Sequence, residues 1–413
     1  MVKIKEITAR QILSSSGYPT IEGRLLLDDG HEIVSSVPAD YFSPPQSAVE
    51  LRDNDSKYQG KAVSRAVYYI NKLIAPKLKG ISPLKQLEID SWLVKADGTA
   101  NMNQLGVNTI LTVSQLLVKA GSYSESLPLY QYLNSFYKKY YQPDFSLNKF
   151  PSAIYTLIKG RKKKESNLDF DKFLIAISSS IPFSQSLQIG FNIYNKLHQD
   201  FQVYDLATNI DAIEAIVQSA TSLNYKLGKE IFFGLDLKAS NLEKNGLYHI
   251  RDRGNPLRIE DYFSYLDSMI NRYAFLILID PLTSQDIDSW SKFNQKISKD
   301  VYLVGNDLTY SNQEKIKKVI TDKAVSAFVI KTHQAGTIKK VFDLVKLAKE
   351  NGLSYIFSSG SEETNDSIEA DLAYGLQADF VSFGPPHGGE NVAKYNRMLE
   401  IEKEMRSQST NES

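Results

Sequence analysis

Short apolar runs recur through the second half of the chain at a nearly constant spacing. Six of them begin near residues 229, 273, 300, 326, 353 and 378, and after the first gap the interval is about 26 residues. Amphipathic stretches such as IKKVFDLVKLAKENG fill the spaces between the runs. Buried parallel strands that alternate with helices at this spacing are typical of a β/α barrel. Two further strands are expected between residues 150 and 227.

The first third of the chain has a different pattern. Alternating polar and apolar residues in ITARQIL, TIEGRLLL and HEIVSSVP predict three strands, the last two joined by a turn at Asp29 and Gly30. From residue 47 to about residue 137 the apolar periodicity becomes helical. We therefore expect an α+β domain over residues 1–135, an α/β barrel over residues 136–405 and a disordered tail over residues 406–413.

The composition excludes several classes of function. Lysine plus arginine equals aspartate plus glutamate, with 48 of each, so no overall field favours nucleic acid or an anionic membrane. The absence of cysteine excludes disulfides, thiolate metal sites and cysteine nucleophiles. The start of the sequence lacks the apolar core of a signal peptide, and no run of about 18 apolar residues occurs. We therefore expect a cytoplasmic protein.

Polar side chains follow the predicted barrel strands at the points where the strands end. These residues are Asp236, Asp280, Asn306, Asp307, Lys331, Ser358, Ser359 and Ser382. The carboxyl ends of barrel strands form one mouth, so these side chains are expected to converge on a single site.

Several segments along the chain resemble enolases, and they occur in the same order as in that family. The similar segments include SSSGYPTIEG, ADGTANMNQLGVN, GLDLKAS, GNDLTYSN, IKTHQAGT, SEETNDSIEADLAYG and VAKYNRMLEIE. The resemblance extends from Ile4 to about Met405 and indicates a divergent enolase-like protein. It implies the enolase fold, in which an α+β amino-terminal domain caps an α/β barrel.

The resemblance also implies a chemistry that can be compared with the residues present. Enolases dehydrate 2-phosphoglycerate to phosphoenolpyruvate with a lysine base, a glutamate and two magnesium ions. Lys331 matches the base. Other catalytic and substrate positions of the family are replaced here, by Lys172, Lys163, Ser359 and Ser382.

The positions of the magnesium ligands are also altered. The three carboxylates of the family correspond to Asp236, Ile279 and Asn306, and the serine that resembles a ligand of the second ion corresponds to Ala39. Only Asp236 keeps a carboxylate, and magnesium favours charged oxygen ligands in octahedral geometry. No tightly bound magnesium or other cofactor is therefore expected.

These replacements leave three functional hypotheses. The first is a pseudoenzyme, an enolase homologue with a binding or regulatory role. The second is a phosphopyruvate hydratase with an unusual site. The third is a metal-free enzyme that uses Lys331, although a lysine base needs burial or nearby cations to lower its pKa and the sequence shows no such helper. Lys331 is also open to a structural interpretation, as an ion-pair partner of Asp236 or Asp307.

A run of basic residues is the strongest local charge feature. It comprises Lys159, Arg161, Lys162, Lys163 and Lys164. The run is interpreted either as a solvated loop or as a patch for a protein or an anionic ligand. Nucleic acid is not expected, because the run is short and has no interleaved aromatic residues.

The resemblance finally implies dimer contacts. Arg10 and Glu22 match residues that join the amino-terminal strands to the last helix of a partner subunit, where the helix positions are Glu400 and Lys403. Like charges would meet in the usual pairing, whereas Arg10 with Glu400 and Glu22 with Lys403 would be favourable. We therefore expect either a re-registered homodimer or a monomer.

Overall fold

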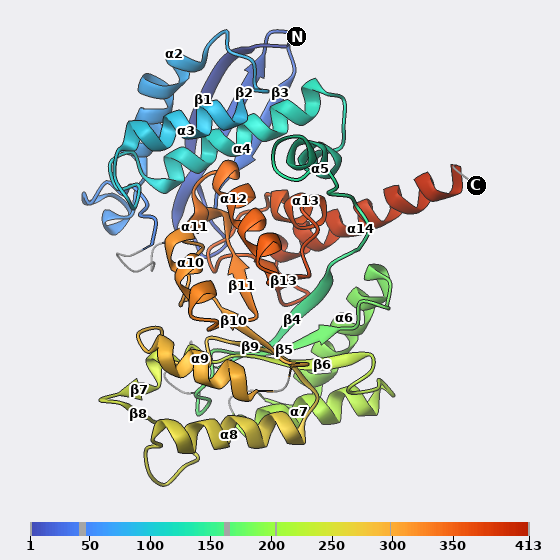
Figure 1. The fold of residues 1–413 in the computed structure, drawn as a ribbon. Coiled ribbons are helices and arrows are strands. Elements are labelled where there is room, and N and C mark those ends of the chain that lie inside the picture. The colour runs from blue at the N-terminus through green and yellow to red at the C-terminus, as the bar shows by residue number, and fades with distance from the viewer. Residues whose placement is uncertain (1, 41–46, 161–165, 203–204, 298, 412–413) are drawn as a thin grey trace.

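The computed structural model describes residues 2–40, 47–160, 166–202, 205–297 and 299–411. Its amino-terminal part forms a small sheet with helices, and the rest of the chain forms a closed barrel beneath it (Figure 1). This arrangement confirms the predicted enolase fold. Within the described ranges, no helix has both the length and the apolar character required to cross a membrane.

The amino-terminal domain contains the three predicted strands. They are β1 (Ile4–Leu13), β2 (Pro19–Leu27) and β3 (Glu32–Ser36), paired antiparallel in the order β1-β2-β3. The helical elements of the domain are η1 (Lys57–Gly60), α1 (Ser64–Tyr68), η2 (Tyr69–Ile74), α2 (Ala75–Leu78), α3 (Gln86–Asp97), α4 (Val107–Ser124) and α5 (Leu129–Tyr140). α4 packs so closely on β2 that a Cβ at Gly23 would lie 2.6 Å from Thr112. Glycine at this position therefore allows the helix to cover the sheet.

Eight strands close the barrel in the order β10-β11-β12-β13-β4-β5-β6-β9. Their bounds are β4 (Ser152–Lys159), β5 (Lys172–Ile177), β6 (Ile231–Asp236), β9 (Phe275–Ile279), β10 (Tyr302–Gly305), β11 (Ala327–Ile330), β12 (Ser354–Ser358) and β13 (Phe380–Gly384). Apolar residues such as Ile154, Leu174, Val304 and Ile356 fill the interior. The six strands expected from the apolar spacing are all present, and β4 and β5 supply the two further strands.

One strand departs from the expected parallel arrangement. β5 runs antiparallel to both of its neighbours, β4 and β6. The connection between Lys159 and Lys172 contains no helix in its described part, so the chain returns directly instead of crossing over the barrel. As a result the first residue of β5, Lys172, lies at the mouth beside the last residue of β6, Asp236.

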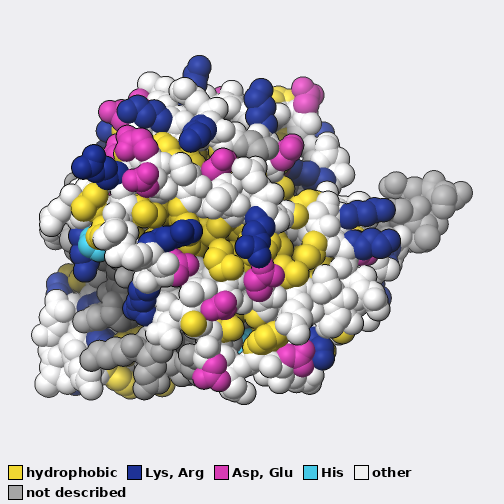
Figure 2. All heavy atoms as spheres, turned by 90° about the horizontal axis from the view of Figure 1, so that it is seen from below, with side chains coloured by type: hydrophobic (Ala, Val, Ile, Leu, Met, Phe, Trp, Pro, Cys, Tyr) yellow, Lys and Arg dark blue, Asp and Glu magenta, His cyan; other side chains and the backbone are white. Residues whose placement is uncertain are grey.

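Helices surround the barrel. They are α6 (Phe183–Asp200), α7 (Asn209–Ser222), α8 (Ile259–Arg272), α9 (Ile287–Lys296), α10 (Gln313–Thr321), α11 (Thr332–Ala335), α12 (Ile338–Glu350), α13 (Ile368–Gly375) and α14 (Gly389–Asn411). A short turn, η4 (Ala239–Asn241), and the hairpin of β7 (Glu243–Lys244) and β8 (Leu247–Tyr248) follow β6. Lysine and arginine side chains lie among acidic ones on the face seen in Figure 2, in keeping with the balanced composition.

The carboxyl-terminal segment differs from the expectation of disorder after Met405. α14 continues to Asn411, and its last turns project from the body of the molecule (Figure 1). Adding residues to an existing helix costs little because nucleation is already complete. An ion pair of 3.1 Å between Arg406 and Glu402, one turn apart, supports this extension.

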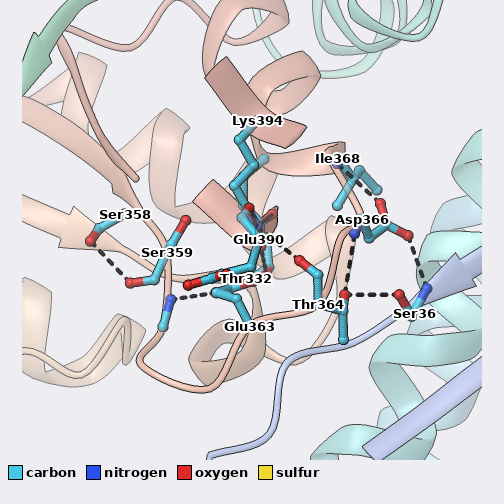
Figure 3. A network of polar contacts seen from close by, with 12 residues as sticks. Ser36, Thr332, Ser358, Ser359, Glu363, Thr364, Asp366, Ile368, Glu390 and Lys394 are labelled. Carbon is cyan, nitrogen blue, oxygen red and sulfur yellow. Dashed lines mark hydrogen bonds and ion pairs between the residues drawn. The ribbon is translucent and has the colours of Figure 1, made fainter. Parts of the chain in front are cut away.

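The loop after β12 ties the barrel to the amino-terminal sheet. Asp366 accepts hydrogen bonds from the Ser35 hydroxyl and the Ser36 backbone N–H, and it pairs with Lys119 of α4 at 2.7 Å. In Figure 3 this loop runs from Ser358 past Glu363 to Asp366, which reaches Ser36. Burial opposes ionisation of Asp366, but Lys119 and the hydrogen bonds outweigh it and lower its pKa. These contacts therefore hold an ionised carboxylate at the domain junction.

Candidate functional site at the barrel mouth

A cavity of about 360 Å³ lies at the mouth of the barrel. Strand ends and the loops after them line it, and many of its lining side chains are charged or polar. The lining includes Lys172, Asn306, Lys331, Ser359 and Ser382. The pattern of strand ends predicts that Asn306, Lys331, Ser359 and Ser382 lie together, and the structure brings them to one cavity. Lys172 was not part of that pattern and reaches the cavity from the first residue of the antiparallel strand β5.

The three positions that correspond to magnesium ligands lie side by side. Asp236 and Ile279 end adjacent strands and are in register, and Asn306 directly follows the next strand, β10. Ile279 packs into the apolar interior of the barrel with 5% of its surface exposed. The Oδ1 atom of Asn306 is buried and has no hydrogen-bond partner. One position thus has no donor atom, and a second offers a neutral oxygen.

Asp236, the remaining carboxylate of the three, pairs with a lysine. The Lys172 Nζ lies 2.9 Å from Asp236 Oδ2 and 3.8 Å from Asp171 Oδ2. The Asp236 side chain is 3% exposed and that of Lys172 is 34% exposed. Burial opposes the charge on Lys172, but Asp236 and Asp171 outweigh it and raise its pKa. An ammonium group therefore contacts the carboxylate that, by the family resemblance, would bind a metal ion.

This pairing corrects the structural interpretation of Lys331. Asp236 pairs with Lys172, and the Lys331 ammonium has no hydrogen bond or ion pair to any part of the chain that the structure describes. Lys331 directly follows β11, and its backbone N–H donates to the Ser311 hydroxyl at 2.9 Å. Its side chain is thus left facing the cavity without a fixed partner.

Lys331 is also better activated than the sequence suggests. Burial lowers its pKa, and the positive charges of Lys172 and Lys238 act in the same direction. Together they outweigh the opposing carboxylates of Asp307 and Asp236. The expectation that no helper surrounds this lysine is therefore wrong. Lys238 was missed because no family position points to it. The available signal was its place two residues after Asp236, at the end of a predicted strand.

The Asp280 side chain is hydrogen-bonded to the backbone of the neighbouring turn. Its carboxylate accepts hydrogen bonds from the N–H groups of Asn306, at 3.0 Å, and Asp307, at 2.7 Å. Burial and the nearby carboxylates of Asp307 and Asp236 raise its pKa to about 8. Asp280 thus shapes the loop after β10 and does not present free oxygens to the cavity. Across the described ranges, no group of three or more histidine, cysteine or acidic side chains is arranged to hold a metal ion.

Two replaced positions lie on loops that border the cavity. Ala39 is 2% exposed, and its N–H donates to the Glu362 carbonyl at 2.8 Å. The Ser359 N–H donates to the Ser382 carbonyl at 3.1 Å, and the Ser359 hydroxyl is buried without a partner. The segment after β3 is thus joined to the loop after β12.

Behind this loop lies a fully buried lysine. The Lys394 Nζ is 3.1 Å from Glu363 Oε2 (Figure 3). It is also 3.9 Å from Glu369 Oε2. Glu363 also accepts a hydrogen bond from the Gly360 N–H, and the Thr332 hydroxyl donates to Glu369 at 3.1 Å. Because Thr332 directly follows Lys331, this network supports the wall of the cavity from outside.

The predicted basic patch and dimer contacts are only partly described. Lys159, at the end of β4, lines the cavity, whereas Arg161 and Lys162 to Lys164 lie outside the described residues. Arg10 and Glu22 lie opposite each other in the sheet and pair at 2.8 Å.

On α14, Glu400 pairs with Arg397 at 3.0 Å, and Lys403 lies one turn further on. Three of the four proposed dimer residues therefore already have partners within the chain.

Comparison with protein families agrees with this architecture. Residues 4–133 match the model of the enolase amino-terminal domain, and residues 148–412 match that of the enolase carboxyl-terminal TIM barrel domain. Together the two matches cover nearly the whole chain and correspond to the sheet domain and the barrel described above. The chain therefore belongs to the enolase family.

Proposed function

We propose that this enolase-family protein does not catalyse the magnesium-dependent dehydration of 2-phosphoglycerate and instead binds a small charged ligand at the barrel mouth without a metal ion. The observation that carries the proposal is the 2.9 Å contact between Lys172 and Asp236. A cation placed there would have to displace an ammonium group that is part of the chain.

Electrostatics explain why this change matters for the reaction. Two magnesium ions stabilise the doubly charged enediolate of the enolase reaction with four positive charges. A lysine ammonium supplies one charge, and magnesium ligation by Ile279 is chemically excluded. Asn306 contributes only a neutral oxygen, which is a weak ligand for a hard cation. The residues present therefore do not match the ligand set that two magnesium ions require.

Unsatisfied polar atoms support a binding role for the cavity. The Asp236 Oδ1, the Asn306 Oδ1 and the Ser359 hydroxyl are all buried without a hydrogen-bond partner. Buried polar atoms are almost always satisfied by protein, water or ligand. Asn306 and Ser359 line the 360 Å³ cavity, which is in keeping with a site that a polar ligand completes.

The test is a direct assay with the purified full chain. The protein is mixed with 2-phosphoglycerate and millimolar magnesium, and phosphoenolpyruvate is followed by its ultraviolet absorbance, with an active enolase as positive control. We expect no formation of phosphoenolpyruvate above the background of the Lys331→Ala variant. Turnover in the parent that Lys331→Ala abolishes would overturn the proposal.

The lowered pKa of Lys331 favours a second candidate, a metal-free reaction in which this lysine acts as a base or an electrophile. An amine-reactive label should modify Lys331 at a lower pH than it modifies exposed lysines. Lys238→Gln removes one of the positive charges that lower the pKa, so labelling of Lys331 should shift to higher pH in this variant. An unchanged labelling profile in Lys238→Gln would count against this candidate.

A further inference from the structure

The cavity at the barrel mouth is lined by two lysines, Lys238 and Lys331, whose ammonium groups have no hydrogen bond or ion pair to the described residues. Burial opposes the charge on Lys238, but nearby carboxylates, with Asp171 the largest contributor, outweigh it and raise its pKa without contacting the ammonium group. Lys172, the third cation, is held by Asp236. Lys238 also has a left-handed backbone conformation, with φ of 45° and ψ of 50°. Residues other than glycine adopt this conformation at a cost, and here it places a cation at the mouth.

A buried acidic group lines the same cavity on the loop after β12. Glu362 is 5% exposed, and its Oε2 atom is buried without any partner. Its neighbour Glu363 is different, because it binds Lys394 at 3.1 Å and the Gly360 N–H. The Glu362 backbone is fixed by its bond to Ala39, so the loop is anchored while the carboxylate stays unsatisfied.

Leaving these charged groups without direct partners lowers the stability of the folded protein. A buried carboxylate without a partner is destabilised, and so are partly buried ammonium groups. A purely anionic ligand would satisfy the lysines but would be repelled by Glu362. A purely cationic ligand would have the opposite problem. A molecule that carries both charges can contact the lysines and Glu362 at the same time.

We propose that the ligand is a small zwitterion of the α-amino-acid class, whose carboxylate contacts Lys238 and Lys331 and whose ammonium group contacts Glu362. This inference rests on the proposed function, since it requires a cavity that works without magnesium. The unsatisfied Ser359 hydroxyl lines the same cavity and provides a further hydrogen bond to a polar group of the ligand.

The experiment screens the standard L-amino acids individually against the full chain, without added metal, by thermal shift and then by calorimetry. The amino acid that binds most tightly is compared with its N-acetyl derivative, which lacks the ammonium group, and with its α-amide, which lacks the carboxylate. We expect each derivative to bind at least about tenfold more weakly, the effect of losing one charge-assisted contact.

Two variants test which protein group contacts each end of the ligand. Glu362→Gln should weaken binding of the amino acid by about tenfold or more while leaving binding of its N-acetyl derivative unchanged or improved. Lys238→Gln should weaken binding of the amino acid and of the N-acetyl derivative but should not affect the α-amide. The control is Glu88→Gln on α3 of the amino-terminal domain, whose side chain is 70% exposed and does not line the cavity. All variants are first checked for an unchanged circular dichroism spectrum.

The outcomes separate this inference from the function on which it rests. Equal binding of an amino acid and its N-acetyl derivative would overturn the zwitterion assignment and leave the metal-independent binding role intact. Failure of every amino acid to bind would also overturn the assignment. Turnover of 2-phosphoglycerate with magnesium would instead overturn the proposed function itself.

Discussion

Replacing Lys172 by methionine tests the ion pair at the barrel mouth. The substitution keeps the length of the apolar stem but removes the ammonium group that contacts Asp236 at 2.9 Å. Asp236 would then remain 97% buried with no cation in contact, since its side chain is only 3% exposed. The stability of the barrel should fall.

The structure sets the expected magnitude. Removing one partner of a buried ion pair costs about 3–5 kcal/mol. Lys172 is 34% exposed, so water already screens its charge, and the Lys238 ammonium nearby compensates in part. We therefore expect the lower end of the range, about 3 kcal/mol.

The assay is unfolding in urea, followed by tryptophan fluorescence. Trp290 is fully buried in the barrel, and a Trp92→Phe background removes the only other tryptophan. The matched control is Lys196→Met on α6, where a lysine of similar exposure, 35%, pairs with Asp200, whose side chain is 33% exposed against 3% for Asp236. Surface pairs of this kind contribute about 0–1 kcal/mol, so the control should be nearly as stable as the parent.

A double variant completes a double-mutant cycle of Lys172 and Asp236. Lys172→Met combined with Asp236→Leu removes both charges, and replacing a buried pair by apolar residues is often nearly neutral. The double variant should therefore be more stable than Lys172→Met alone by about 2 kcal/mol or more. If Lys172→Met were as stable as the Lys196→Met control, or if the two substitutions simply added, the ion pair would not be a significant contact and the reasoning would fail.

Two further predictions concern buried carboxylates whose pKa values are shifted in opposite directions. Asp366→Asn breaks the pair with Lys119 at the domain junction and should cost about 3 kcal/mol at neutral pH. Because the pKa of Asp366 is lowered, its contribution is present above about pH 4 and is lost as the pH falls further, so the parent and the variant should converge in acid. The pKa of Asp280 is raised to about 8, so its contribution is complete below about pH 4 and is lost as the pH rises through 8. The unfolding free energy of the parent should therefore decrease over this range relative to Asp280→Asn, and parallel pH profiles of the two would refute this assignment.

The sequence predicted the architecture because its signals are local and repeated. Apolar runs at regular intervals located six barrel strands, and alternation located the three strands of the amino-terminal sheet. The antiparallel direction of β5 was not predictable in the same way, because a buried strand has the same apolar pattern in either direction. That direction places Lys172 opposite Asp236, so the ion pair could not be inferred from the spacing of strand ends.

The site was predictable as a set of positions but not as a set of contacts. Family positions identified Lys331, Asp236, Ile279 and Asn306, and the structure brings them to one mouth. The pairing of Lys172 with Asp236 depends on distances between residues 64 positions apart, which one sequence does not contain. The role of Glu362 could not be predicted either. Only the folded loop reveals that the Glu362 carboxylate is buried without a partner while the adjacent Glu363 has one.

Calorimetric titration of the full chain with magnesium, in the presence and absence of 2-phosphoglycerate, tests the central claim most directly. If the ammonium of Lys172 has replaced the metal ion at Asp236, millimolar magnesium should produce no saturable heat in either condition. The heat profile should also match that of Asp236→Asn, which lacks the last carboxylate. Saturable binding of one or two magnesium ions that disappears in Asp236→Asn would contradict the account.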